Sequence, residues 1–182
     1  MLCNVAGWGR QSVENTPEPL TIAHEAELHS MIVSYYLGVG SLSSRRDPNK
    51  NAEVATGPLL QRMLEFGTAE PGTSLTVITA IAIKQIHVLE YSSSRVKAIG
   101  CGILYSKLVS YEGEYIQSLR PMPFMNVFVF VLEDEKWKLF THYFFGDQDA
   151  ASRDWAYVSE EEKLAIGNLE EYMDTYWPCG FY

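Results

Sequence analysis

Four histidines are the side chains of this sequence best suited to move protons near neutral pH, because the ordinary pKa of histidine lies close to 7. They are His24, His29, His87 and His142. His87 lies within the apolar run 86–89, and His142 alternates with phenylalanines. Either one is a candidate general base in an apolar pocket, with Tyr105 as a candidate partner. The spacing fits a hydrogen-bonded histidine of the core or sheet edge equally well.

Aromatic residues make up 13 % of the chain and are frequent in its second half. They either fill an ordinary core or line an apolar ligand pocket, which needs aromatic walls and a few polar groups. The candidate pocket residues are Tyr91, Asn126, Phe128 and Trp137. A separate cluster near the carboxyl end consists of Trp177, Phe181 and Tyr182. Because a free aromatic tail promotes unwanted association, we expect this cluster to fold back on its own domain or to bind a partner.

The sequence lacks the motifs of the common nucleotide, metal and hydrolase sites. It has no P-loop, no G-x-G-x-x-G, no H-E-x-x-H, no EF-hand loop and no G-x-S-x-G elbow. No two histidines or cysteines have close ligand spacing, so we expect neither a metal nor another cofactor. The acidic runs 160–162 and 170–171 are interpreted as solvated helix surface, and the run 133–135 as a hairpin tip.

The charge balance is acidic, with a formal net charge of −9. This argues against a nucleic-acid binder that works by neutralising phosphates. It leaves open an acidic inhibitor or immunity-type partner of a basic protein, because opposite charge speeds encounter. The most apolar stretches, 75–83 and 124–132, are too short for a spanning helix, so we expect no transmembrane segment.

Three widely spaced cysteines, Cys3, Cys101 and Cys179, argue against a complete disulfide framework. We expect Cys101 to be a buried, inert thiol, while a bridge between Cys3 and Cys179 stays open. No signal peptide is visible at the start, so a cytoplasmic or other reducing compartment is favoured. Leu2-Cys3 as the remnant of a lipidation box is the less favoured alternative.

Residue patterns predict helices at both ends of the domain. Residues 1–20 predict an extended arm, and apolar residues at 28, 32, 35 and 39 then share one face of a helix that begins near Thr21. The stretch 41–57 predicts a loop with a short helix near 51–54, and a second helix runs from Gly57-Pro58 to Gly67. Ser159 and Glu162 form a capping box, which predicts a carboxyl-terminal helix.

Between residues 75 and 145, β-branched and aromatic residues predict four strands, 75–91, 95–111, 115–132 and 136–145, joined as antiparallel hairpins. Pro121 and Pro123 divide the third, because proline cannot donate to a ladder. The fold class is therefore α+β, with amino-terminal helices packed on a strongly bent antiparallel sheet of four or more strands, plus a carboxyl-terminal helix. We expect an arm (1–20), a domain (21–147) and a final helix with aromatic tail (148–182).

This layout resembles the nuclear-transport-factor-2-like, or cystatin-like, α+β cone. The resemblance rests on the helices at 28–39 and 59–66, the strands at 77–89 and 95–109, and the hairpin 128–139 with its acidic turn and Trp-Lys-Leu continuation. It also extends to related domains of chloroplast-division, secretion-channel and mitochondrial import proteins. It covers roughly residues 20–147, and the helix after residue 158 departs from it. The superfamily contains dehydratases, isomerases, hydrolases and interaction domains, so the resemblance selects no function and carries over no residue.

Three functions remain. The first, which we prefer because no complete catalytic set is recognisable, is a non-enzymatic interaction or assembly domain that binds itself or another protein. The second is a cone that binds a small apolar molecule, or acts on it by dehydratase- or isomerase-like proton transfer through His87 or His142. The third is the acidic partner of a basic protein.

Overall fold

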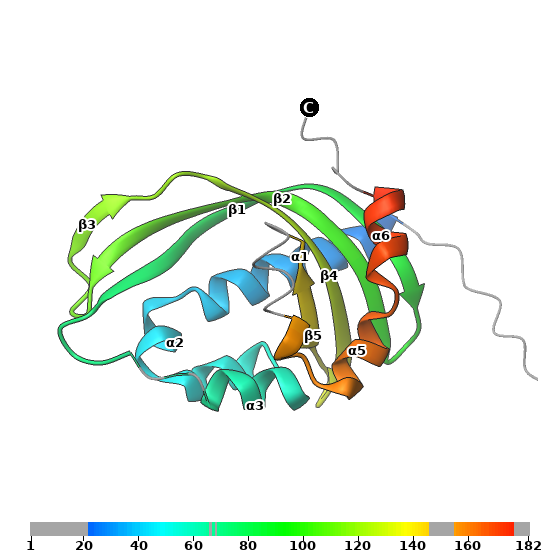
Figure 1. Ribbon diagram of the computed structural model, residues 1–182, viewed down its shortest axis with the longest axis horizontal. Coiled ribbons are helices and arrows are strands. Elements are labelled where there is room, and N and C mark those ends of the chain that lie inside the picture. Colours follow the sequence, from blue (N-terminus) through cyan, green and yellow to red (C-terminus); the bar gives the residue numbers. More distant parts are fainter. Residues whose placement is uncertain (1–21, 66, 68, 146–154, 177–182) are drawn as a thin grey trace, which may run out of the picture.

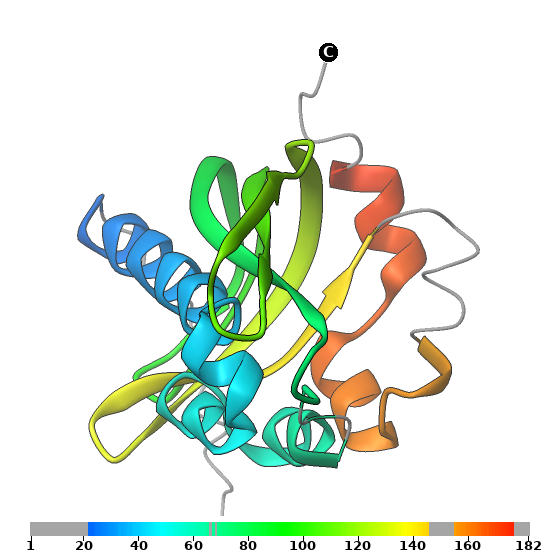
Figure 2. The ribbon, with the colours of Figure 1, turned by 90° about the vertical axis from the view of Figure 1, so that its left-hand side faces the viewer.

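The chain folds as a curved antiparallel sheet with its amino-terminal helices inside the curve and its carboxyl-terminal helices on the outer face (Figure 1). This computed structural model describes residues 22–65, 67, 69–145 and 155–176. The α+β class predicted from the sequence is confirmed. Among the helices in those ranges, none is long and apolar enough to cross a membrane. Figure 2 shows α1 and α6 on opposite sides of the sheet.

The inner layer contains three α-helices and one 3-10 helix. They are α1 (Ile22–Val39), α2 (Leu42–Arg46), η1 (Pro48–Glu53) and α3 (Gly57–Glu65). The α1 face predicted from the spacing is correct, since Leu28, Ile32 and Tyr35 are buried. The loop predicted from residue 41 was wrong over α2. The Ser41 side chain accepts a hydrogen bond from the Ser44 N–H and caps this short helix.

Five antiparallel strands form one sheet. They are β1 (Ser74–Tyr91), β2 (Arg95–Ser110), β3 (Tyr115–Ser118), β4 (Met122–Glu133) and β5 (Lys136–Phe144). Their order is β1-β2-β4-β5, and β3 pairs with the end of β2. The predicted division of the third strand by proline is confirmed, because β3 and β4 are separated at residues 119–121. Consecutive hairpins therefore account for the topology.

The sheet bends strongly because its first two strands are irregular and carry glycines. The pairing of β1 with β2 shifts register at three places, each a bulge that increases local twist. A Cβ atom at Gly102 would lie 2.3 Å from the Ala82 carbonyl oxygen and 2.8 Å from the Phe124 ring. One at Gly100 would lie 2.9 Å from the Phe128 ring. Only glycine permits backbone and rings to approach this closely.

Alternate residues of the central strands pack in two separate cores. The inner core lies between α1 and the concave face of the sheet, and the outer core lies between the convex face and the carboxyl-terminal helices. The inner core includes Leu28, Ile32, Phe124, Phe128 and Phe130. The outer core includes Ile99, Cys101, Met125, Val127, Ile166 and Tyr172. Both faces of β2 and β4 are therefore buried, which explains their almost continuous apolar sequences.

The carboxyl-terminal region differs from the prediction in two respects. Two helices, α5 (Glu160–Ile166) and α6 (Leu169–Tyr176), replace the single helix expected. The break falls at Gly167, whose φ of +92° lies in the region that favours glycine. Cys101 is fully buried as expected, but it is disulfide-bonded, so the prediction of an inert thiol was wrong. The other two cysteines of the chain lie outside the described residues.

The carboxylate of Glu162 is the main polar link between the layers. Its oxygens accept hydrogen bonds from Arg62 Nη1 (2.7 and 2.9 Å), from Thr141 Oγ1 (2.8 Å) and from the Ser159 N–H and hydroxyl (3.0 Å each). The predicted capping box is confirmed. The interpretation of residue 162 as solvated helix surface was wrong, because its side chain is 1 % exposed. This carboxylate joins α5 to α3 and to β5.

We predict that Glu162→Gln lowers the free energy of unfolding by about 3 kcal/mol, because it leaves a half-buried guanidinium without its charged partner. The control Glu161→Gln changes an exposed carboxylate on the same helix, and we expect a change within about 0.5 kcal/mol. Urea unfolding of the three proteins measures both values. Equal stability of the two variants would contradict a structural role for the buried carboxylate.

Candidate functional site

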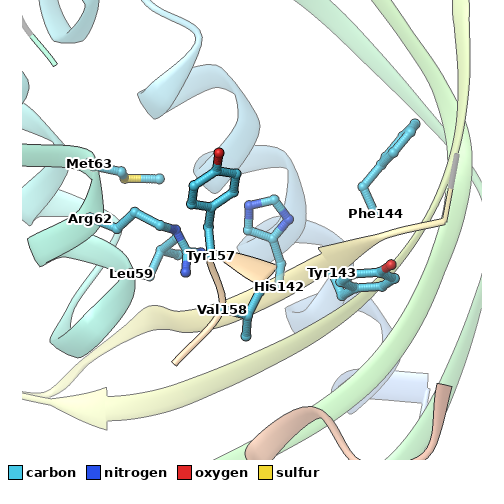
Figure 3. Close-up of a pocket in the computed structure, with 8 residues that line it drawn as sticks. All are labelled: Leu59, Arg62, Met63, His142, Tyr143, Phe144, Tyr157 and Val158. Carbon is cyan, nitrogen blue, oxygen red and sulfur yellow. The ribbon is translucent and has the colours of Figure 1, made fainter. Parts of the chain in front are cut away.

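A cavity of about 430 Å³ lies between α3, β5 and the segment that precedes α5 (Figure 3). Eight residues line it: Leu59, Arg62, Met63, His142, Tyr143, Phe144, Tyr157 and Val158. Most of the wall is apolar, whereas Arg62 and His142 provide nitrogen atoms. Figure 3 shows the Arg62 guanidinium, which comes from α3, and the His142 ring, which comes from β5, among the side chains that line the cavity. This combination of apolar walls and few polar groups is typical of small-molecule sites.

His142 belongs to a buried polar cluster behind the cavity wall. Asn126 Nδ2 donates to the Tyr36 hydroxyl oxygen (2.7 Å) and lies 3.3 Å from His142 Nδ1. With the amide oriented in this way, Nδ1 accepts and the ring proton resides on Nε2. His142 and Asn126, both singled out from the sequence, therefore lie within hydrogen-bonding distance of each other. Asn126 Oδ1 is buried and has no hydrogen-bond partner within the described residues.

The surroundings of His142 keep its ring neutral. The pKa of His142 is lowered to about 4, mainly by burial and also by the Arg62 guanidinium, while the Glu162 carboxylate acts in the opposite direction. The Tyr35 ring centroid lies 5.4 Å from that of His142. Burial also raises the pKa of Tyr35 and of Tyr36 well above that of an exposed tyrosine. Near pH 7 the cluster is thus a set of neutral hydrogen-bonding groups.

Arg62 was not among the residues singled out from the sequence. It is the only basic residue of α3, and its Nη1 is held by Glu162. No hydrogen bond within the described residues uses its Nε or Nη2. The capping box identified Glu162 as a helix-start residue, but only the tertiary fold brings an arginine 100 positions away onto its carboxylate. No local pattern in the sequence indicates this pair.

The other candidate catalytic residues lie on the opposite face of the sheet. His87 pairs in register with Ile99 of the outer core, and its ring centroid lies 4.9 Å from that of Tyr176. Tyr105 follows Cys101 by four residues along β2, so it also points to the outer face, and it is 40 % exposed. The structure therefore brings neither side chain to His142.

The four candidate pocket residues divide between two places. Phe128 pairs in register with His142 and lies in the inner core beside Asn126. Tyr91 and Trp137 instead meet at α1: Trp137 Nε1 donates to Glu27 Oε1 (2.8 Å), and the Tyr91 hydroxyl donates to Glu27 Oε2 (3.4 Å). Trp137 and Glu27 line a separate cavity of about 230 Å³.

Two further predictions concern the partner-binding aromatic tail and the binding of metal ions. Trp177, Phe181 and Tyr182, which we predict to bind a partner, lie outside the described residues. Within the described ranges, no group of three or more His, Cys, Asp or Glu side chains is arranged to hold a metal ion. The polar side chains that line the 430 Å³ cavity are the nitrogen donors Arg62 and His142 and the hydroxyl-bearing Tyr143 and Tyr157, and these donors suit an oxygen-bearing organic group.

Comparison with known proteins yields fold likenesses only. No family model matches the chain, and no curated protein matches it. The intermembrane space region of the chloroplast protein ARC6 aligns at a TM-score of 0.46 and 16 % identity, covering 71 % of this chain and 100 % of that one. A candidate Ca/calmodulin-dependent kinase II association domain from Exiguobacterium sibiricum aligns at 0.36 and 13 %, covering 69 % and 94 %. Both likenesses are weak.

The neutral His142 predicts a specific pH dependence of stability. Its pKa of about 4 in the folded chain is below the value near 6.5 of an unfolded chain, so the unfolded chain binds more protons between these values. The stabilisation is complete above pH 6.5 and is lost as the pH falls toward 4. Between pH 7 and pH 5 we expect the wild type to lose about 2 kcal/mol more than His142→Phe, measured by urea unfolding. Parallel pH profiles of the two proteins would contradict a buried neutral His142.

Proposed function

We propose that this chain is a non-enzymatic interaction or assembly domain built on a nuclear-transport-factor-2-like cone. The observation that carries the proposal is an apolar stretch of the outer sheet face that the carboxyl-terminal helices leave exposed. We call it the outer strip, and it consists of the exposed Ala80, Tyr105 and Pro123 and the half-buried Ala82 and Ile103. Exposed contiguous apolar surface on a sheet is typical of a protein-binding site.

The register of the strands supports the outer strip as one surface. Ala80 pairs with Tyr105, Ala82 with Ile103, and Ile103 with Pro123. Directly paired residues share a face, and so do residues two apart along a strand. Cys101, two residues before Ile103, belongs to the outer core. The strip is therefore the continuation of the outer core beyond its helical cover, with Ile103 at its centre and Tyr105 as its largest exposed side chain.

The chemistry of the inner face supports a non-enzymatic role. A general base works best when its pKa is near the operating pH. Burial holds the pKa of His142 far below 7 and those of Tyr35 and Tyr36 far above it. Arg62 and Glu162 are paired with each other. The groups gathered there are arranged to hydrogen-bond rather than to exchange protons.

A second copy of the chain is the partner we expect at the outer strip, because most soluble oligomers are symmetric homo-oligomers. Tyrosine within an apolar patch is a frequent hot spot of such interfaces. The partner-binding residues predicted from the sequence, Trp177, Phe181 and Tyr182, are part of the same proposal. They follow α6, whose last residue, Tyr176, packs on His87 of the outer face.

We predict that Tyr105→Glu weakens self-association by about tenfold or more, because it places a charge within an apolar contact and removes the largest exposed side chain of the strip. Light scattering over a wide range of concentrations measures the molecular mass. The control Ala52→Glu introduces the same acid at an exposed position of η1, on the helical side, and should associate like the wild type. A chain lacking residues 177–182 tests the tail. A wild type that stays monomeric at every concentration would refute assembly with a second copy.

A second function is supported by a different observation, the 430 Å³ cavity beside His142. Its apolar walls and fixed nitrogen donors suit the binding of a small organic molecule. The unpartnered Asn126 Oδ1 behind the His142 ring is a further buried polar group at this end of the cone. The cavity lies at the edge strand β5, and none of its lining residues belongs to the outer strip, so the two functions are compatible.

A further inference from the structure

We propose that the cavity beside His142 binds a small apolar monocarboxylate, which Arg62 and the Nε2–H of His142 hold by its carboxylate. This inference rests on the second function above and specifies its ligand class. It is independent of assembly through the outer strip. Three features of the cavity lead to it: the free edge of Arg62, the tautomer of His142 and the composition of the wall.

Arg62 lines the cavity and has a carboxylate-binding edge that no described residue occupies. A guanidinium has two edges suited to bidentate contact with a carboxylate. Glu162 contacts only Nη1, with both of its oxygens (2.7 and 2.9 Å). The edge formed by Nε and Nη2 has no hydrogen-bond partner within the described residues. Glu162 is itself fixed by Thr141 and Ser159, so the position of the Arg62 group is set before any ligand arrives.

His142 adds a neutral donor at the same cavity. Asn126 Nδ2 lies against Nδ1, which places the ring proton on Nε2. The ring is packed between Tyr35 and Phe128, with centroids 5.4 and 6.4 Å away, so its orientation is restricted. One cation and one neutral donor match the two oxygens of a single carboxylate. An amide fits these two groups less well, because its NH₂ group is itself a donor and would face the donors of Arg62 or His142.

The apolar part of the cavity wall determines the chemistry of the rest of the ligand. Leu59, Met63, Phe144 and Val158 supply apolar surface, and Tyr157, which is 66 % exposed, lies among the lining residues. A volume of about 430 Å³ accommodates one aromatic ring or a short aliphatic chain together with the carboxylate. A dicarboxylate is disfavoured, because its second charge would be buried without a partner.

The test compares a carboxylate with its neutral analogue. We choose 3-phenylpropanoate and 3-phenylpropanamide, which have the same ring and chain, and titrate each by NMR of the protein with selective labelling of the histidine rings. We expect the acid to bind at least about tenfold more tightly than the amide and to shift the His142 ring signals. The double variant Arg62→Met/Glu162→Gln removes both charges of the ion pair together. In this variant the preference for the acid over the amide should disappear.

Two further variants make the result decisive. Arg120→Met removes an exposed arginine of the β3–β4 connection and should leave binding of the acid unchanged. His142→Phe keeps the ring volume and removes the donor, so it tests the site even if the double variant fails to fold, and we expect a severalfold loss for the acid. Equal binding of acid and amide would overturn the carboxylate inference while leaving a ligand site. Binding of neither probe would overturn both, and an equal loss in Arg120→Met would assign the effect to surface charge.

Discussion

The carboxylate of Glu162 is the contact on which the arrangement of the cavity depends. It is buried, it carries a charge, and its partners come from α3, from β5 and from the cap of its own helix. Removing such a group from water is costly, so it stabilises the fold only while all its partners are in place. This requirement fixes α3 against β5 and holds the segment before α5 across the gap between them. The cavity is the space that remains where these pieces meet.

The two faces of the sheet have different roles because they are covered in different ways. The concave face is filled by α1 and by large rings, and its polar groups are gathered at Asn126 and His142. The convex face is covered by α5 and α6 over only part of its length, and beyond them β1, β2 and β4 expose the outer strip. Alternate residues of one strand serve both faces, so β4 places Asn126 against His142 on one face and Pro123 in the outer strip on the other.

Local patterns were sufficient for the fold class and for most of its elements. The α1 face, the strands, the proline interruption and the capping box all depend on residues close in sequence, and the structure has each of them. Asn126 and His142, which were both singled out from the sequence, lie side by side, with 3.3 Å between Asn126 Nδ2 and His142 Nδ1. The period of two along a strand could not tell which face each histidine occupies, since both faces are apolar, so His87 remained a candidate. The pairing of Arg62 with Glu162 is a tertiary contact across 100 positions, and Gly167 was overlooked as a helix break.

The burial of Cys101 has a consequence for how the chain meets chemical reagents. Its sulfur lies in the outer core with Tyr172 of α6 above it, and it has no exposed surface. Thiol–disulfide exchange requires a thiolate to reach a sulfur directly. A direct attack on this sulfur therefore requires a local opening of the outer core. At high reductant concentration the rate of attack at this sulfur would equal the rate of that opening, whereas attack at the partner sulfur of the disulfide would not depend on it.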